Sequence, residues 1–334
     1  MNETFASDRE QTEALLSQSL KLAAQIKEAL SRRLVGQDAL KKRLITALLV
    51  DGHVLLEGVP GLAKTLAIKA LAESVSGSFQ RIQFTPDLLP ADLLGTEVFR
   101  PQEGTFEIRK GPVFANFVLA DEINRAPAKV QSALLETMQE RQVTIGNQTY
   151  PVPKPFFVLA TQNPIEQEGT YPLPEAQVDR FIMKLKIVYP TSEQEKQMLD
   201  LVTKPSFQTS KETPVATLED IAMLKRASEH IYIDERIKQY IVNIVSATRN
   251  PKDYGLNLSS LIELGASPRA TIALYLVARA EAFLAGERFV VPQHIKDAAL
   301  DVLRHRIMPS YEAEAEGLTT DSLVNMVLDG VQVP

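Results

Sequence analysis

The chain has 334 residues, more than one compact core usually holds, so two domains are expected. Its composition is that of a globular protein, and its net charge of −6 argues against a broad nucleic-acid-binding surface. The absence of cysteine excludes disulfides, thiolate metal sites and cysteine nucleophiles. Residues 1–11 are unlike a signal peptide, and no apolar run reaches the roughly 18 residues that a membrane span needs. We therefore expect a cytoplasmic protein without membrane insertion.

Two helices are expected before the first strand, over residues 8–34 and 38–50, because apolar residues recur there at helical spacing. The turn between them contains Val35, Gly36 and Gln37. An apolar turn just before a phosphate-binding loop is suited to contact an adenine ring. A plain turn between helices explains the same residues equally well.

Residues 53–65 indicate a short apolar strand, a turn rich in glycine and proline, and the start of a helix. That order suits a phosphate-binding loop, whose backbone N–H groups and helix N-terminus surround a triphosphate. Lys64 would reach the β- and γ-phosphates, and the Thr65 hydroxyl would bind Mg²⁺. Ala63 replaces a glycine of the usual pattern and would strain the loop only if its φ must be positive. An ordinary strand, turn and helix with an exposed lysine is the alternative.

The residues expected to contact ATP are those of the two turns and the helix start: Val35, Gly36, Gln37, Gly58, Val59, Pro60, Gly61, Leu62, Ala63, Lys64, Thr65 and Leu66.

After the helix over residues 64–76, an alternating strand is expected over residues 81–84 and a short helix over residues 90–94. Residues 97–99 and 105–108 then predict a β-hairpin. Its Phe99 and Phe106 are suited either to contact a pore or partner, or to pack the hairpin onto its own domain. We favour the second use.

Residues 117–122 form a continuous apolar run that ends in two acidic residues, which is typical of a strand buried on both faces of a parallel sheet. Carboxylates at the carboxyl end of such a strand face a ligand crevice. Asp121 can therefore contribute to a Mg²⁺ site, and Glu122 can polarise the attacking water. The other interpretation, a solvated acidic strand end, is weak because the phosphate loop predicts this element.

A helix over residues 124–140 and a second hairpin over residues 142–152 follow. The next buried strand, over residues 156–161, leads to Asn163, which would bind the γ-phosphate or the lytic water. A short helix then ends near Arg180, before the last strand at residues 182–188. A surface salt bridge is the usual role of such an arginine, but its spacing suits an arginine finger supplied to a neighbouring subunit.

The motifs together resemble those of the AAA+ ATPases, and within them the MoxR family. The resemblance rests on residues 58–65, 120–125, 160–164 and 179–181, and it extends over nearly the whole chain. It implies a P-loop NTPase parallel sheet flanked by helices, followed by an α-helical lid. It also implies that residues 120–125 are the Walker B motif, that Asn163 belongs to sensor 1 and that Arg180 is the finger. Alanine is common at position 63 in this family, and both hairpins match inserts that it shares with magnesium-chelatase motor subunits.

We place the nucleotide-binding domain at residues 1–189 and the lid domain at residues 190–334, where the pattern is helical throughout. Ser267, Pro268 and Arg269 predict a helix start. The resemblance makes Arg269 sensor 2, which reaches the γ-phosphate; a solvent-facing arginine is the alternative.

The expected activity is Mg²⁺-dependent ATP hydrolysis, with Lys64, Glu122, Asn163, Arg180 and Arg269 as catalytic residues and Thr65 and Asp121 as metal ligands. The resemblance implies a hexameric ring, remodelling of a client protein in the maturation of metal-dependent enzymes, and a partner with a von Willebrand factor A domain. The alternatives are the motor subunit of a chelatase, a nucleic-acid motor and a nucleotide-dependent scaffold without turnover. The acidic balance disfavours the nucleic-acid motor, and the complete set of catalytic residue types disfavours the scaffold.

Overall fold

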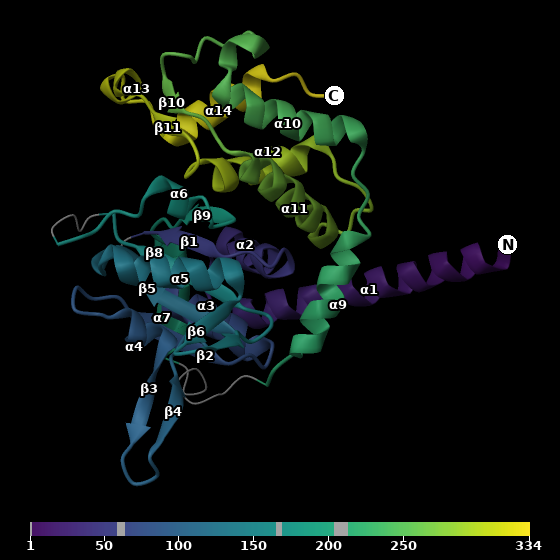
Figure 1. Ribbon diagram of the computed structural model, residues 1–334. Helices are drawn as coiled ribbons and strands as arrows, with labels where there is room; N and C mark the ends of the chain where they lie inside the picture. Colours follow the sequence, from purple (N-terminus) through teal and green to yellow (C-terminus); the bar gives the residue numbers. More distant parts are fainter. Residues whose placement is uncertain (1, 59–63, 165–168, 204–212) are drawn as a thin grey trace. The chain divides into compact units, whose positions relative to one another are not determined.

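The computed structural model describes residues 2–58, 64–164, 169–203 and 213–334 (Figure 1). The chain forms two compact units. The first contains most of the sheet and consists of residues 24–180 and 185–221, and the second consists of residues 1–23, 181–184 and 222–334. The predicted boundary at residues 189 and 190 stays a prediction.

A five-stranded sheet with the strand order β2–β5–β8–β1–β9 forms the centre of the α/β fold. Its strands are β1 (Val54–Glu57), β2 (Phe79–Gln83), β5 (Phe117–Asp121), β8 (Phe157–Gln162) and β9 (Met183–Lys186). The pairs β2–β5, β5–β8 and β8–β1 are parallel. The apolar residues of β1, β5 and β8 are buried, as expected for strands that are covered on both faces. The predicted parallel sheet is thereby confirmed.

The helices described within residues 2–203 are close to their predicted positions. They are α1 (Asn2–Arg33), α2 (Asp38–Leu49), α3 (Lys64–Ser74), α4 (Pro90–Leu94), the 3-10 helix η1 (Ile123–Arg125), α5 (Ala128–Glu140), α6 (Glu175–Val178) and α7 (Ser192–Val202). The buried faces of α2 and α3 are rich in leucine, isoleucine and alanine, and that of α5 contains valine, leucine and methionine. Burial of such side chains stabilises the fold by about 1.5–3 kcal/mol for each large one.

Both predicted hairpins form. They are β3 (Gly95–Arg100) with β4 (Thr105–Lys110), and β6 (Gln142–Ile145) with β7 (Gln148–Pro151). The β3–β4 hairpin extends away from the sheet (Figure 1). Phe99 and Phe106 are 52% and 66% exposed, and their ring centroids lie 5.1 Å apart. Our preference for packing against the domain core was therefore wrong, because the two rings pack on each other.

The second unit is mainly helical. It includes most of α9 (Leu218–Glu229), and α10 (Glu235–Arg249), the 3-10 helix η2 (Pro251–Tyr254), α11 (Pro268–Leu284), α12 (Pro292–Leu303), α13 (Tyr311–Ala315) and α14 (Thr320–Gly330). A wholly helical region was predicted, and this is wrong in one detail. Two short strands, β10 (Ile262–Leu264) and β11 (Met308–Pro309), pair antiparallel. Strands of three and two residues are too short to show an alternating pattern.

Among the helices described here, none is long and apolar enough to cross a membrane.

Candidate functional site

Parallel pairing brings the ends of β1, β5 and β8 to one edge of the sheet. In the register, Ala120 lies beside Ala160, and Glu57 lies beside Gln162. The Gly58 N–H donates to the carbonyl of Gln162 at 3.3 Å and extends the β1–β8 pairing. Gly58, Asp121, Glu122 and Asn163, which directly follow or end these strands, therefore share this edge. Ligands of open α/β sheets bind at such a carboxyl edge.

The described part of the phosphate loop consists of its two ends. Val59, Pro60, Gly61, Leu62 and Ala63 lie outside the described residues. Lys64, Thr65 and Leu66 form the first turn of α3, as predicted. The Lys64 ammonium group donates to the carbonyl oxygen of Gly58. This bond holds the lysine against the end of β1, where the loop begins.

The charge of Lys64 interacts with the two carboxylates of the edge. Burial lowers the pKa of Lys64, and the negative charges of Asp121 and Glu122 oppose this effect. A partly desolvated cation near two carboxylates is suited to bind a polyanion, because a low local dielectric strengthens its attraction to phosphate.

Thr161 on β8 connects the two acidic residues. Its hydroxyl donates to Asp121 Oδ1 at 2.7 Å and accepts from the Glu122 backbone N–H at 2.9 Å. Thr161 is 1% exposed, so water does not replace these bonds readily. Thr161 was not among the predicted site residues. Its position two residues before Asn163, at the end of the predicted strand, is the signal that could have found it.

Glu122 has an unusual backbone conformation, with φ 56° and ψ 51°. A residue other than glycine in the left-handed region costs about 1–2 kcal/mol, and such strain is concentrated at functional sites. Its Oε2 accepts from Gln83 Nε2 at 2.8 Å and from Arg125 Nη1 at 3.1 Å. Two donors therefore fix the carboxylate that we expect to polarise water.

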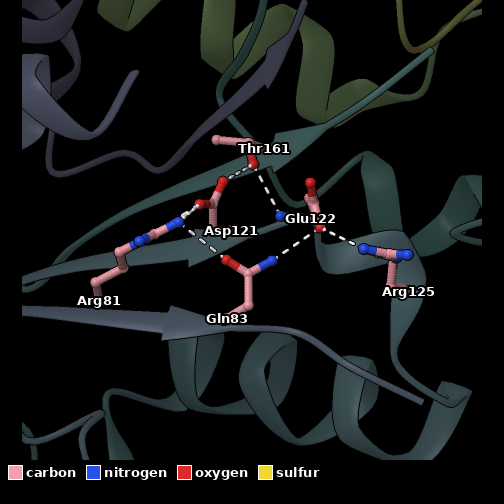
Figure 2. Close-up of polar contacts among 6 residues, drawn as sticks. All are labelled: Arg81, Gln83, Asp121, Glu122, Arg125 and Thr161. Carbon is pink, nitrogen blue, oxygen red and sulfur yellow. Dashed lines mark hydrogen bonds and ion pairs between the residues drawn. The ribbon is translucent and has the colours of Figure 1, made fainter. Parts of the chain in front are cut away.

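Strand β2 supplies two residues of the site that the sequence analysis missed. Figure 2 shows Arg81 and Gln83 directed from β2 toward Asp121 and Glu122. Gln83 lies opposite Asp121 in the register, and Arg81 is two residues earlier, so both face the same side of the sheet. The predicted alternation of this strand implies that Arg81 and Gln83 share one face. It does not show that this face is directed toward Asp121 and Glu122.

The turn at Val35, Gly36 and Gln37 has a defined conformation. Gly36 has φ 64° and Gln37 has φ 51°. A Cβ atom at Gly36 would lie 2.5 Å from the side-chain Nε2 of Gln194 on α7, so this turn and α7 approach closely. Contact with adenine stays a prediction for these three residues.

The two predicted catalytic arginines, Arg180 and Arg269, do not belong to the strand ends that form this edge. Arg180 follows α6, and its Nη1 donates to the carbonyl oxygen of Leu135 on α5 at 3.0 Å. Arg269 is in the first turn of α11, where the hydroxyl of the N-cap Ser267 accepts from its backbone N–H. The predicted helix start is confirmed. The roles of Arg180 in a neighbouring site and of Arg269 at the γ-phosphate stay predictions.

The donor set fits a magnesium ion that is bound together with phosphate. Asp121 provides a carboxylate with a side chain 15% exposed, and Thr65 provides a hydroxyl at the start of α3. The described residues contain no group of three or more His, Cys, Asp or Glu side chains arranged to hold a metal. Mg²⁺ commonly uses one or two protein ligands, water and substrate phosphates, and so it needs no such group.

Comparisons with known proteins agree with this geometry. A model of the ATPase family associated with various cellular activities (AAA) matches residues 53–183, and a model of the AAA lid domain matches residues 257–327. The chain is 47% identical to the chaperone MoxR1 of Mycobacterium tuberculosis over 306 residues, which cover 91% of this chain and 80% of that protein. It is 31% identical to the protein MoxR of Methylorubrum extorquens over 341 residues, which cover 96% of this chain and 98% of that protein.

A crystal structure from Cytophaga hutchinsonii, of a protein provisionally assigned as an ATPase, has a TM-score of 0.92 and 46% identity. The match covers 98% of this chain and 99% of that chain. The fold and the two family models assign the chain to the AAA ATPases, and its similarity to MoxR1 and MoxR leads to one assignment: the chain belongs to the MoxR family of AAA ATPases.

Proposed function

We propose that the protein hydrolyses ATP in a Mg²⁺-dependent reaction and uses the energy to remodel a client protein. The observation that carries the proposal is the acidic pair at the end of β5, held by Thr161 at the sheet edge where the phosphate loop begins. Glu122 would accept a proton from the attacking water, and Asn163 would orient that water. A bound Mg²⁺ would supply positive charge that offsets the negative charge developing on the phosphoryl group.

Lys64 would bind the β- and γ-phosphates, with Thr65 and Asp121 as the protein groups that hold the metal. Arg180 of a neighbouring subunit and Arg269 would stabilise the charge on the transferred phosphoryl group. An arginine finger contributes about 10³–10⁵ in turnover. We therefore infer that the active form is an oligomer, and we propose a hexameric ring in the cytoplasm.

The proposal that ATP hydrolysis remodels a client protein rests on sequence similarity to named relatives. A relative with 47% identity is named a chaperone, which supports remodelling as the use of the ATPase cycle. We propose a partner with a von Willebrand factor A domain, and metal-cofactor maturation as the process served. Binding to the integrator subunit of a chelatase would instead favour the motor-subunit alternative.

The test is specific ATPase activity as a function of protein concentration, at saturating ATP and Mg²⁺. We expect specific activity to rise with concentration and to fall at least 10³-fold in Arg180→Ala. Arg236→Ala is the matched control, because Arg236 is 79% exposed and pairs with Asp234 at its own helix start. A flat profile together with full activity of Arg180→Ala would show a self-sufficient site and would refute the shared-site mechanism.

A further inference from the structure

Arg81 forms an ion pair with Asp121, the carboxylate that we expect to bind the metal. Its Nη2 lies 2.5 Å and its Nε 3.1 Å from Oδ2 of Asp121, so two N–H groups donate to one oxygen (Figure 2). The other oxygen, Oδ1, accepts from Thr161 at 2.7 Å. Both carboxylate oxygens of Asp121 therefore have protein donors in this structure.

The two partners of Asp121 differ in accessibility. Thr161 is buried, whereas the Arg81 side chain is 50% exposed and that of Asp121 is 15% exposed. The exposed partner of Asp121 is therefore the one that can move away at less cost, because water can solvate a displaced guanidinium group.

The position of Arg81 follows from the strand register and not from a chance surface contact. Gln83 lies opposite Asp121, and Arg81, on the same face of β2, reaches the carboxylate diagonally. Arg81 Nη2 also donates to Gln83 Oε1 at 3.0 Å, and Gln83 Nε2 donates to Glu122. The guanidinium group is thus part of a continuous chain of polar contacts that includes both acidic residues.

We propose that Arg81 competes with the divalent cation for Asp121. The inference rests on the proposed Mg²⁺-dependent function. In the nucleotide-free site the guanidinium group balances the charge of Asp121. A divalent cation near Asp121 repels Arg81, so loading of metal and nucleotide requires the ion pair to open. Arg81 therefore raises the Mg²⁺ concentration that the site needs.

The competing explanation is that Arg81 holds Asp121 in the orientation that the metal requires. The two explanations predict opposite effects of removing the charge. If Arg81 competes, its loss improves Mg²⁺ binding. If Arg81 only orients the carboxylate, its loss weakens Mg²⁺ binding.

The experiment measures binding of a fluorescent, non-hydrolysable ATP analogue during a Mg²⁺ titration. We expect the Mg²⁺ midpoint to fall about 10-fold in Arg81→Met, the size of the repulsion between a divalent ion and one exposed unit charge in a high dielectric. Arg81→Gln should show the same change without loss of a polar side chain, and it replaces the first variant if that variant does not fold. Arg81→Lys, which keeps the charge, should retain a midpoint near that of the wild type.

The matched control is Arg100→Met. Arg100 on β3 pairs with Glu107 on the neighbouring strand β4, and the two side chains are 52% and 54% exposed. Its removal should leave the Mg²⁺ midpoint unchanged. An unchanged or raised Mg²⁺ midpoint in Arg81→Met and Arg81→Gln would overturn this inference but not the proposed function. Wild-type binding that is absent, or that does not respond to Mg²⁺, would overturn both the inference and the proposed function.

Discussion

Thr161→Val tests whether β8 holds the acidic pair in place. Valine has nearly the shape of threonine but lacks the hydroxyl group. The variant removes the hydrogen bond to Asp121 Oδ1, which is 2.7 Å long, and the acceptor of the Glu122 N–H, which lies at 2.9 Å. Thr161 is 1% exposed, so the Glu122 N–H is left with little access to water.

The expected loss of stability follows from these two bonds. A buried N–H without an acceptor costs about 1–3 kcal/mol, and a hydrogen bond to a charged group contributes about 1.5–3 kcal/mol. Asp121 keeps Arg81 as a donor, which reduces the second loss. We therefore expect the free energy of unfolding to fall by about 2–4 kcal/mol.

The same change should affect turnover, because the left-handed conformation of Glu122 loses the bond that fixes its backbone. A shift of about 1 Å in a catalytic group can reduce the rate about 10²-fold. We expect ATP turnover to fall by about 10- to 100-fold, with nucleotide affinity much less affected.

The assays are urea titration for stability and phosphate release for turnover. Thr161→Ser keeps the hydroxyl and should retain most of the wild-type stability and most of the wild-type turnover. Thr149→Val is the matched control, because its exposed hydroxyl contacts that of Thr144, at 3.0 Å, on a surface hairpin. A Thr161→Val variant as stable and active as Thr149→Val would refute the role of this side chain.

Two further variants test other parts of the structure. Burial, together with the charge of Arg306, holds the pKa of His305 well below 6.5, so His305 stays neutral in the folded chain while the unfolded chain gains a proton below about pH 6.5. Stability should therefore fall with decreasing pH by up to about 1.4 kcal/mol per unit. His305→Gln should flatten this slope in urea titrations at pH 7.5 and 5.5, unlike His230→Gln at an exposed position; equal slopes would contradict the assignment. In urea titrations, Gly36→Ala should lower the free energy of unfolding by about 1 kcal/mol more than Gly255→Ala does. Both glycines have positive φ, but a Cβ would meet Gln194 only at Gly36, and equal losses would show that α7 does not restrict this turn.

The elements with strong local patterns could be predicted from the sequence. The apolar runs of β5 and β8 are long, and their polar ends identified the acidic pair and Asn163 at the carboxyl edge. The hairpin β6–β7 was also predictable, because its strands alternate around a turn with Gly146 at positive φ. In each case the local sequence and the final structure agree.

The contacts across the sheet could not be predicted. The partners of Asp121 and Glu122 come from β2 and β8, and only the register brings them together. The pairing of Phe99 with Phe106 likewise depends on the hairpin register, which puts the two residues opposite each other. Strands β10 and β11 are defined by a long-range pairing, without a local pattern.

Glu122→Gln tests the central claim most directly. The substitution keeps the size of the side chain and one acceptor oxygen but removes the carboxylate that would activate water. We expect phosphate release to fall about 10²–10⁴-fold while binding of the ATP analogue is retained. Glu140→Gln, at the exposed end of α5, is the control and should keep wild-type activity. Unchanged phosphate release in Glu122→Gln would contradict the catalytic assignment and, with it, the mechanism proposed for this site.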